Sequence, residues 1–181
     1  MSAAAEAELK ALELALQMEE DGRQYYLEAG ARCQNRVARA TFTWLADLEF
    51  QHMKAIRHFN AELTRSGTWG TVSPDLPEAA EWVLQSQNLF RDALAEVDEH
   101  VPAEATDSDA LDHGMELELR TRDYYQKCLE GAADPMAHRF FEGLRDAEYK
   151  HYELLENTKL YLDNPDVFFE QNEGLLVEPP L

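Results

Sequence analysis

The chain has 181 residues, of which 45% are hydrophobic, and a formal net charge of -20 at pH 7. This length and apolar content suit one domain with a substantial core, whereas the acidity argues against nucleic acids and anionic membrane surfaces as partners, because both bind basic patches. No apolar stretch reaches the length of a membrane span and residues 1–16 lack the basic start of a signal peptide, so we expect a cytoplasmic protein with no membrane segment.

The periodicity of the apolar residues predicts an all-α protein with four long helices, at about residues 5–34, 37–65, 107–130 and 135–162. Short links make the first two helices antiparallel neighbours, and likewise the last two, while residues 67–106 form one long crossover between helices 2 and 3. Residues 77–99 of this crossover carry an apolar face at helical spacing, so we expect part of it to be helical. Together these elements form one domain, residues 1–163, followed by an extended C-terminal tail, residues 164–181.

The second helix carries a Glu-x-x-His motif, Glu49 and His52, in the middle of an otherwise apolar stripe. The apolar members of the stripe are Ala38, Phe42, Leu45, Ile56, Phe59 and Leu63. A carboxylate and an imidazole one turn apart that both face into a bundle are typical of metal ligands. The motif alone is weak evidence, because glutamate is common in this chain and a histidine on an apolar stripe is more often a hydrogen-bonded core residue.

An internal repeat strengthens the metal hypothesis. When the sequence is shifted by 99 residues, Glu49 aligns with Glu148 and His52 with His151, which are the two Glu-x-x-His motifs of the chain. The other aligned pairs are Glu19 and Glu118, Arg23 and Arg122, Tyr25-Tyr26 and Tyr124-Tyr125, Phe42 and Phe141, Leu45 and Leu144, and Asp47 and Asp146. Each half thus adds one more glutamate to its stripes, Glu19 in the first and Glu118 in the second.

Electrostatics favours metal binding over a purely structural role. If the four helices pack by their stripes, four carboxylates meet at mid-bundle, and an unpartnered buried carboxylate alone costs several kcal/mol. The two arginines on the stripes, Arg23 and Arg122, are too few to balance them and stand one turn away. Two divalent metal ions would balance all four. One Glu from each of two helices with Glu-x-x-His from each of the others is the ligand set of di-iron and di-manganese carboxylate bundles.

These motifs resemble the ferritin-like superfamily of di-iron carboxylate proteins, and within it the rubrerythrin-type branch, over residues 5–163. The segments that carry the resemblance are Met18-Glu19-x-x-Gly22-x-x-Tyr25-Tyr26, Phe42-x-x-Leu45-Ala46-Asp47-x-Glu49-x-x-His52, Glu118 with Tyr124-Tyr125, and Phe141-x-x-Leu144-x-x-x-Glu148-x-x-His151. The resemblance implies a ferritin-like four-helix bundle in which Glu49 and Glu148 bridge two metal ions. Glu19 with His52 and Glu118 with His151 would complete the two coordination spheres, although the sequence does not say which histidine serves which ion.

Oxygen and imidazole ligands suit iron or manganese, and zinc could occupy them as well. The resemblance implies two iron ions per chain. Tyr26 and Tyr125 lie two turns after Glu19 and Glu118 on the same face, so their hydroxyls could reach the metal ligands and assist catalysis. An ordinary buried tyrosine is an equally good interpretation of each. Asp47 and Asp146 fall off the stripes, and we expect them to be solvated or to bond between helices.

Two departures separate this chain from the rubrerythrins that it resembles. Those proteins add a rubredoxin domain with paired C-x-x-C motifs, whereas Cys33 and Cys128 form no such pair and are expected to be free thiols. Electrons would therefore come from an external donor such as a rubredoxin or a reductase. Rubrerythrins also carry an extra carboxylate one turn after the third ligand, where this chain has Thr121.

The leading hypothesis is a rubrerythrin-like, non-haem di-iron oxidoreductase that reduces peroxide or dioxygen. The first alternative is a ferroxidase or iron storage or delivery protein of the ferritin type, in which iron is the substrate. The second is a metal-stabilised helical interaction module whose aromatic tail binds a partner. The resemblance also implies a homodimer.

Overall fold

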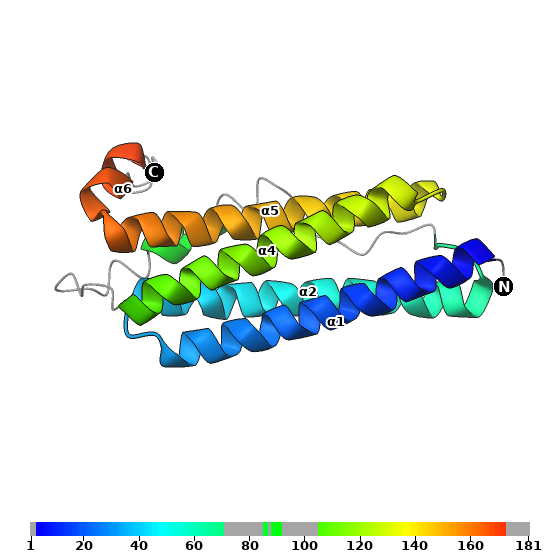
Figure 1. The fold of residues 1–181 in the computed structure, drawn as a ribbon, viewed down its shortest axis with the longest axis horizontal. Coiled ribbons are helices and arrows are strands. Elements are labelled where there is room, and N and C mark those ends of the chain that lie inside the picture. The colour runs from blue at the N-terminus through cyan, green and yellow to red at the C-terminus, as the bar shows by residue number, and fades with distance from the viewer. Residues whose placement is uncertain (1–2, 71–84, 87, 92–104, 173–181) are drawn as a thin grey trace, which may run out of the picture.

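The computed structural model describes residues 3–70, 85–86, 88–91 and 105–172, and these contain helices and no strand. Four long helices lie side by side (Figure 1): α1 (Ala3–Arg32), α2 (Arg36–Ser66), α4 (Ala105–Gly131) and α5 (Pro135–Asp163). A short helix, α6 (Pro165–Gln171), follows α5. The all-α, ferritin-like bundle predicted from the sequence is confirmed, and each long helix begins and ends within two residues of its predicted bounds.

Equivalent polar caps start the second helix of each pair. The Asn35 side chain accepts hydrogen bonds from the backbone N–H groups of Val37 and Ala38 at the start of α2. Asp134, 99 residues later, accepts one from Met136 at the start of α5, where Pro135 occupies the first turn. Because each cap comes directly after a link of a few residues, both helix pairs fold back as antiparallel hairpins.

The two hairpins pack against each other to make the bundle. α1 packs mainly on α2 and α4 mainly on α5, and the contacts of α1 with α4 and of α2 with α5 join the pairs. α2 ends and α4 begins at opposite ends of the bundle (Figure 1), which is why the chain needs a long connection at this point. The helix predicted at residues 77–99 lies largely outside the described residues, but residues 85–86 and 88–91 are helical.

The C-terminal segment begins as a helix rather than as the extended arm expected from its prolines. Asn164 ends α5, and Pro165 starts α6, where its missing N–H is not needed. Phe168 is buried against Phe90 and Tyr161, so α6 is held on the body by an aromatic cluster. Residues 173–181 lie outside the described part of the chain.

A buried polar layer divides the hydrophobic core in two. One apolar cluster contains Leu45 of α2 and Leu155 of α5, and the other contains Ile56 of α2 and Leu144 of α5. Glu49 and His52 lie between the two apolar clusters on α2, and Glu148 and His151 lie between them on α5. All four residues are less than 4% exposed. The apolar halves therefore keep the helices together while the polar layer lies between them at mid-bundle.

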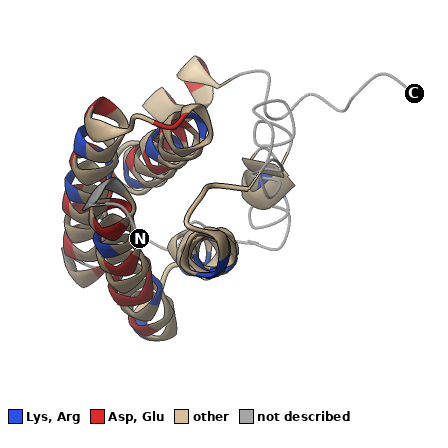
Figure 2. Cartoon of the chain, turned by 90° about the vertical axis from the view of Figure 1, so that its right-hand side faces the viewer, with Lys and Arg blue, Asp and Glu red and all other residues tan. Residues whose placement is uncertain are grey.

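The outer surface is strongly acidic but mixed. In the view along the helices, acidic positions (red) recur along them with basic positions (blue) in between (Figure 2). No helix in the described part of the chain is long and apolar enough to cross a membrane. Cys33 is buried, Cys128 is partly buried, and both are free thiols, as expected.

Gly114 of α4 lies in a tightly packed position against α5 and α1. A Cβ atom at this position would stand 3.2 Å from Leu155 Cδ1 of α5 and 3.4 Å from the Tyr26 ring of α1. Real Cβ atoms seldom come this near to a neighbour, so a side chain here would push α4 away from α1 and α5. A side chain at residue 114 would therefore crowd the Tyr26 ring.

We expect Gly114→Val to destabilise the protein by about 1–3 kcal/mol, because the added methyl groups overpack a dense interior. Urea unfolding followed by circular dichroism measures the change. The matched control is Gly131→Val, because a Cβ at Gly131 meets no atom within 4 Å. Equal losses in the two variants would show that the approach at Gly114 is unimportant and that the loss is one of backbone preference alone.

Candidate metal centre

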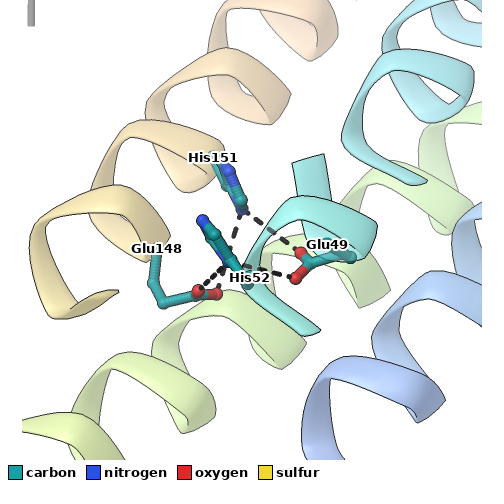
Figure 3. Close-up of side chains that lie close together, drawn as sticks. All are labelled: Glu49, His52, Glu148 and His151. Atoms are coloured by element: carbon teal, nitrogen blue, oxygen red, sulfur yellow. Dashed lines mark ion pairs between the residues drawn. The ribbon is translucent and has the colours of Figure 1, made fainter. Parts of the chain in front are cut away.

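The structure brings together all six residues that the sequence predicted as metal ligands. Figure 3 shows four of them, Glu49 and His52 from α2 and Glu148 and His151 from α5, facing one another across the bundle. Ligand atoms of these four lie within 4.8 Å of one another, and all four side chains are buried. The remaining two, Glu19 of α1 and Glu118 of α4, contact one imidazole each.

Each of the two central carboxylates faces both imidazoles, with one oxygen for each. In Glu49, Oε2 lies 3.5 Å from His52 Nδ1 and Oε1 lies 3.3 Å from His151 Nδ1. In Glu148, Oε1 lies 3.3 Å from His52 Nδ1 and Oε2 lies 3.9 Å from His151 Nδ1. The two imidazole rings are stacked with centroids 5.1 Å apart. Glu49 and Glu148 therefore span the centre of the site, whereas each histidine belongs to one side of it.

The two outer carboxylates complete the two sides. Glu19 Oε2 lies 3.2 Å from His52 Nδ1, and Glu118 Oε1 lies 3.6 Å from His151 Nδ1. The family resemblance implied this pairing, whereas the sequence did not say which histidine serves which ion. The contacts pair Glu19 with His52 and Glu118 with His151.

Tyr26 and Tyr125 tie the two halves of the repeat together at the site. The Tyr26 hydroxyl of α1 donates a hydrogen bond to Glu118 of α4, and the Tyr125 hydroxyl of α4 donates one to Glu19 of α1. Both rings are buried. Each tyrosine thus restrains the outer carboxylate of the opposite half, a contact that the helical spacing indicated in kind but could not assign to a partner.

Burial and mutual repulsion perturb the ionisation of the cluster. Burial, with the nearby charge of Glu49, raises the pKa of Glu19 to about 8 and that of Glu148 well above its usual value. Burial would likewise raise the pKa of Glu49, but its hydrogen bonds with Glu19 and the imidazoles lower it. Burial would lower the pKa of both imidazoles, yet the carboxylates raise it, to about 9 in His151. Without a cation the cluster holds protons.

The donor set fits two divalent metal ions. Ionised carboxylates and neutral imidazoles are the ligand forms of these residues, and in those forms the cluster carries four negative charges. In the described part of the chain the ion-pair partners of these carboxylates are the two imidazoles, and neither stripe arginine takes part. Arg23 stacks on Phe50 and Arg122 pairs with Asp123 at 2.7 Å. Two divalent ions would neutralise the cluster and replace its protons.

The residues beside the motifs lie outside the cluster. Asp47 and Asp146 are exposed, as expected, and Asp146 accepts a hydrogen bond from Arg145. Thr121 is 8% exposed, and its hydroxyl donates to the Leu117 carbonyl one turn back. Sequence reasoning gave no role to Gly22, although a Cβ there would lie 3.9 Å from Glu49 Cδ. The signals in the sequence are that Gly22 belongs to a segment that carries the family resemblance and that the repeat aligns it with Thr121.

Comparison with known proteins identifies one family. The model of the rubrerythrin family matches residues 10–159, which is most of the chain and contains all six clustered residues. Searches of curated proteins and of solved structures found no match.

The metal-free protein should lose thermal stability as the pH rises from about 5 to 9. The pKa of Glu19 rises from 4.5 to about 8 on folding and that of His151 from 6.5 to about 9, so the folded state binds more protons than the unfolded state in this window. The stability that His151 contributes is complete below pH 6.5 and lost by about 9, and the penalty at Glu19 grows from pH 4.5 to about 8. Melting curves of chelator-treated protein measure this trend.

Bound metal should reverse the trend, because metal ions compete with these protons and bind more tightly at higher pH. The gap in Tm between loaded and metal-free protein should therefore widen as the pH rises. Glu19→Gln should flatten the slope of the metal-free protein, whereas Glu20→Gln, which removes an exposed neighbouring carboxylate, should not. Equal slopes in both variants would contradict a proton-holding cluster.

Tyr26→Phe should weaken metal binding about 10- to 100-fold, because Glu118 loses the hydroxyl that restrains it. Competition titration with a chromophoric chelator measures the affinity. Tyr25→Phe is the matched control, since the Tyr25 hydroxyl donates to the Ala110 carbonyl outside the cluster and its loss should leave the affinity unchanged. Similar effects of the two substitutions would mean that the Tyr26 hydroxyl has no particular role.

Proposed function

This chain belongs to the rubrerythrin family, and we propose that it is a non-haem di-iron oxidoreductase that reduces hydrogen peroxide or dioxygen. The observation that carries the proposal is the arrangement of Glu49 and Glu148, each of which turns one oxygen toward His52 and the other toward His151. Carboxylates placed in this way can bridge two metal ions. The proposal makes all six clustered residues metal ligands.

In the proposed centre Glu49 and Glu148 would be shared by the two ions, and each half of the repeat would supply one further pair of ligands. Glu19 with His52 would hold one ion and Glu118 with His151 the other, following the contacts of 3.2 and 3.6 Å between them. Iron is favoured by the mixed oxygen and nitrogen donors and by the family, and manganese or zinc would fit the same donors. An iron pair supplies one electron per ion, and reduction of one hydrogen peroxide to two water molecules consumes these two electrons with two protons.

The protein supports this chemistry through its packing and its hydrogen bonds. The apolar clusters on both sides of the polar layer keep bulk water away from the centre. The hydroxyls of Tyr26 and Tyr125 hold the outer carboxylates in place while the charge on the centre changes. They also carry protons within hydrogen-bond reach of Glu118 and Glu19, and in this sense we propose a catalytic role for both tyrosines.

The proposal needs an electron source outside the chain. Cys33 lies in the link between α1 and α2, Cys128 lies in α4, and the two form no C-x-x-C motif that could hold a rubredoxin-type iron. We therefore propose an external donor, such as a rubredoxin or a reductase, that returns two electrons after each turnover. A homodimer in the cytoplasm is part of the same proposal.

A ferroxidase or iron storage role is the second candidate, and one observation favours it. Thr121 occupies the position of the extra carboxylate of rubrerythrins, and its hydroxyl is bonded to the Leu117 carbonyl, so the cluster is a symmetric set of four glutamates and two histidines as in ferritin-type sites. In that role iron is the substrate, dioxygen the oxidant, and iron leaves the site after oxidation. The two functions therefore differ in iron stoichiometry and in oxidant.

Purification without chelators, followed by anaerobic loading with Fe(II), should give about two iron ions per chain. Separate mixing with hydrogen peroxide and with dioxygen in a stopped-flow spectrometer should show faster oxidation by peroxide. Glu49→Ala should abolish loading of the pair, because it removes a bridging ligand and leaves the other buried carboxylates unbalanced. Asp47→Ala, two residues away but exposed, should load and react as the unaltered protein does.

The other functions give different results in the same experiment. Iron uptake that continues far beyond two ions per chain with dioxygen would favour the ferroxidase function over the peroxide reductase function. Tight binding of two ions without turnover by either oxidant would favour the metal-stabilised interaction module. Absence of metal, with Glu49→Ala as stable as the unaltered protein, would refute a metal centre of any kind.

A further inference from the structure

The two faces of the metal centre differ at one pair of equivalent positions. Gly22 of α1 is partly exposed, whereas its equivalent in the repeat, Thr121 of α4, is buried. Both come three residues after an outer glutamate, Glu19 or Glu118, and so lie one turn along the helix on the side that faces the centre. The symmetry of the six ligands is thus broken in the layer around them.

Gly22 stands directly outside a bridging carboxylate. Apart from its two chain neighbours and the helix's own backbone, a Cβ built on Gly22 would have one atom of the described residues within 4 Å, Glu49 Cδ at 3.9 Å. This is an ordinary contact distance, so packing does not require glycine there, in contrast to Gly114. Glycine in the middle of a helix is unfavourable for stability. Gly22 therefore leaves the space of a side chain unfilled next to Glu49, which is itself 3% exposed. We call this space the opening.

The opposite face is closed at the same level. Thr121 fills the equivalent position with a side chain that is 8% exposed, and its hydroxyl is fixed by a hydrogen bond of 3.2 Å to the Leu117 carbonyl. A small molecule that approaches from α4 and α5 meets this side chain before it reaches Glu148. From α1 and α2 it meets no side chain at residue 22.

Two basic side chains, Arg23 and Lys54, lie near the opening over Phe50 of α2. Arg23 follows Gly22 and Phe50 follows Glu49, and the Arg23 guanidinium lies 5.2 Å from the centroid of the Phe50 ring, with Lys54 Nζ 5.0 Å from the same ring. On the opposite face the equivalent of Arg23 is neutralised by Asp123 at 2.7 Å. The equivalent of Lys54 there is Glu153. Asp21, on the other side of Gly22, is exposed and accepts a hydrogen bond from Gln17 of the same helix at 2.9 Å, and its equivalent in the repeat is Arg120. The cations that lie over Phe50 of α2 are therefore Arg23 and Lys54, and at this point they favour neutral or anionic molecules over metal cations.

We propose that the gap at Gly22 is the entrance through which small neutral or anionic ligands, of the size of hydrogen peroxide, dioxygen or azide, reach the metal centre. Gly22 is then a residue that determines which molecules gain access, and metal ions load by another route. This inference rests on the proposed di-metal centre, since it concerns how a ligand reaches that centre. It assigns the two faces of a nearly symmetric bundle different roles.

The test exchanges the two side chains. Gly22→Thr should close the entrance, and Thr121→Gly should open the opposite face. The double variant should have one opening, on the α4 side instead of the α1 side. The rate of azide binding to iron-loaded protein, followed by stopped-flow absorbance, should fall about tenfold or more in Gly22→Thr, because a close-packed wall leaves no space for diffusion. It should return toward the original rate in the double variant. The rate of Co(II) uptake by metal-free Gly22→Thr should stay unchanged.

Gly22→Ala is a second variant that fills less of the opening, because its single added carbon stands at contact distance from Glu49. We expect its rate of azide binding to lie between those of the original protein and Gly22→Thr. Azide rates that are unaltered in both variants, with two metal ions bound, would overturn the entrance and leave the di-metal centre standing. Equal slowing of azide binding and Co(II) uptake would overturn the separate routes. An original protein that binds no metal would refute the proposed function itself, and the entrance with it.

Discussion

The structure depends on one constraint, the burial of four carboxylates in the middle of a helical bundle, where their ion-pair partners among the described residues are two imidazoles. Such a layer is unfavourable unless it holds protons or cations. It explains why the core consists of two apolar clusters and why both tyrosine hydroxyls point inward. The rubrerythrin family match covers all of these positions.

The bundle is nearly two-fold symmetric, and its contacts repeat with the sequence. Tyr25 donates to the Ala110 carbonyl at 2.6 Å, and Tyr124 donates to the Ala11 carbonyl at 2.8 Å, each shifted by 99 residues from the other. Because the symmetry extends to backbone contacts and helix caps, a departure from it is informative. Gly22, equivalent to Thr121 in the repeat, is a departure beside the carboxylate cluster, and for that reason it carries the proposed entrance.

Much of this architecture could be predicted from the sequence, because helical stripes and an internal repeat are local signals. The six clustered residues followed from the placement of Glu49 and His52 on one stripe and their recurrence at Glu148 and His151. The pairing of Glu19 with His52 came from the family resemblance alone. The partners of the tyrosine hydroxyls could not be predicted, since they depend on how the hairpins dock. The first turns after α5 were also missed, because prolines that suggest an extended arm can equally start a helix such as α6. The division into a domain of residues 1–163 and a tail stays a prediction.

Anomalous diffraction at the iron edge, from crystals loaded with Fe(II) under anaerobic conditions, tests the central claim most directly. The account predicts two peaks per chain between Glu49 and Glu148, one beside Glu19 and His52 and the other beside Glu118 and His151. A single peak, peaks outside this layer, or a layer that stays without metal while the six side chains keep their mutual contacts would contradict it.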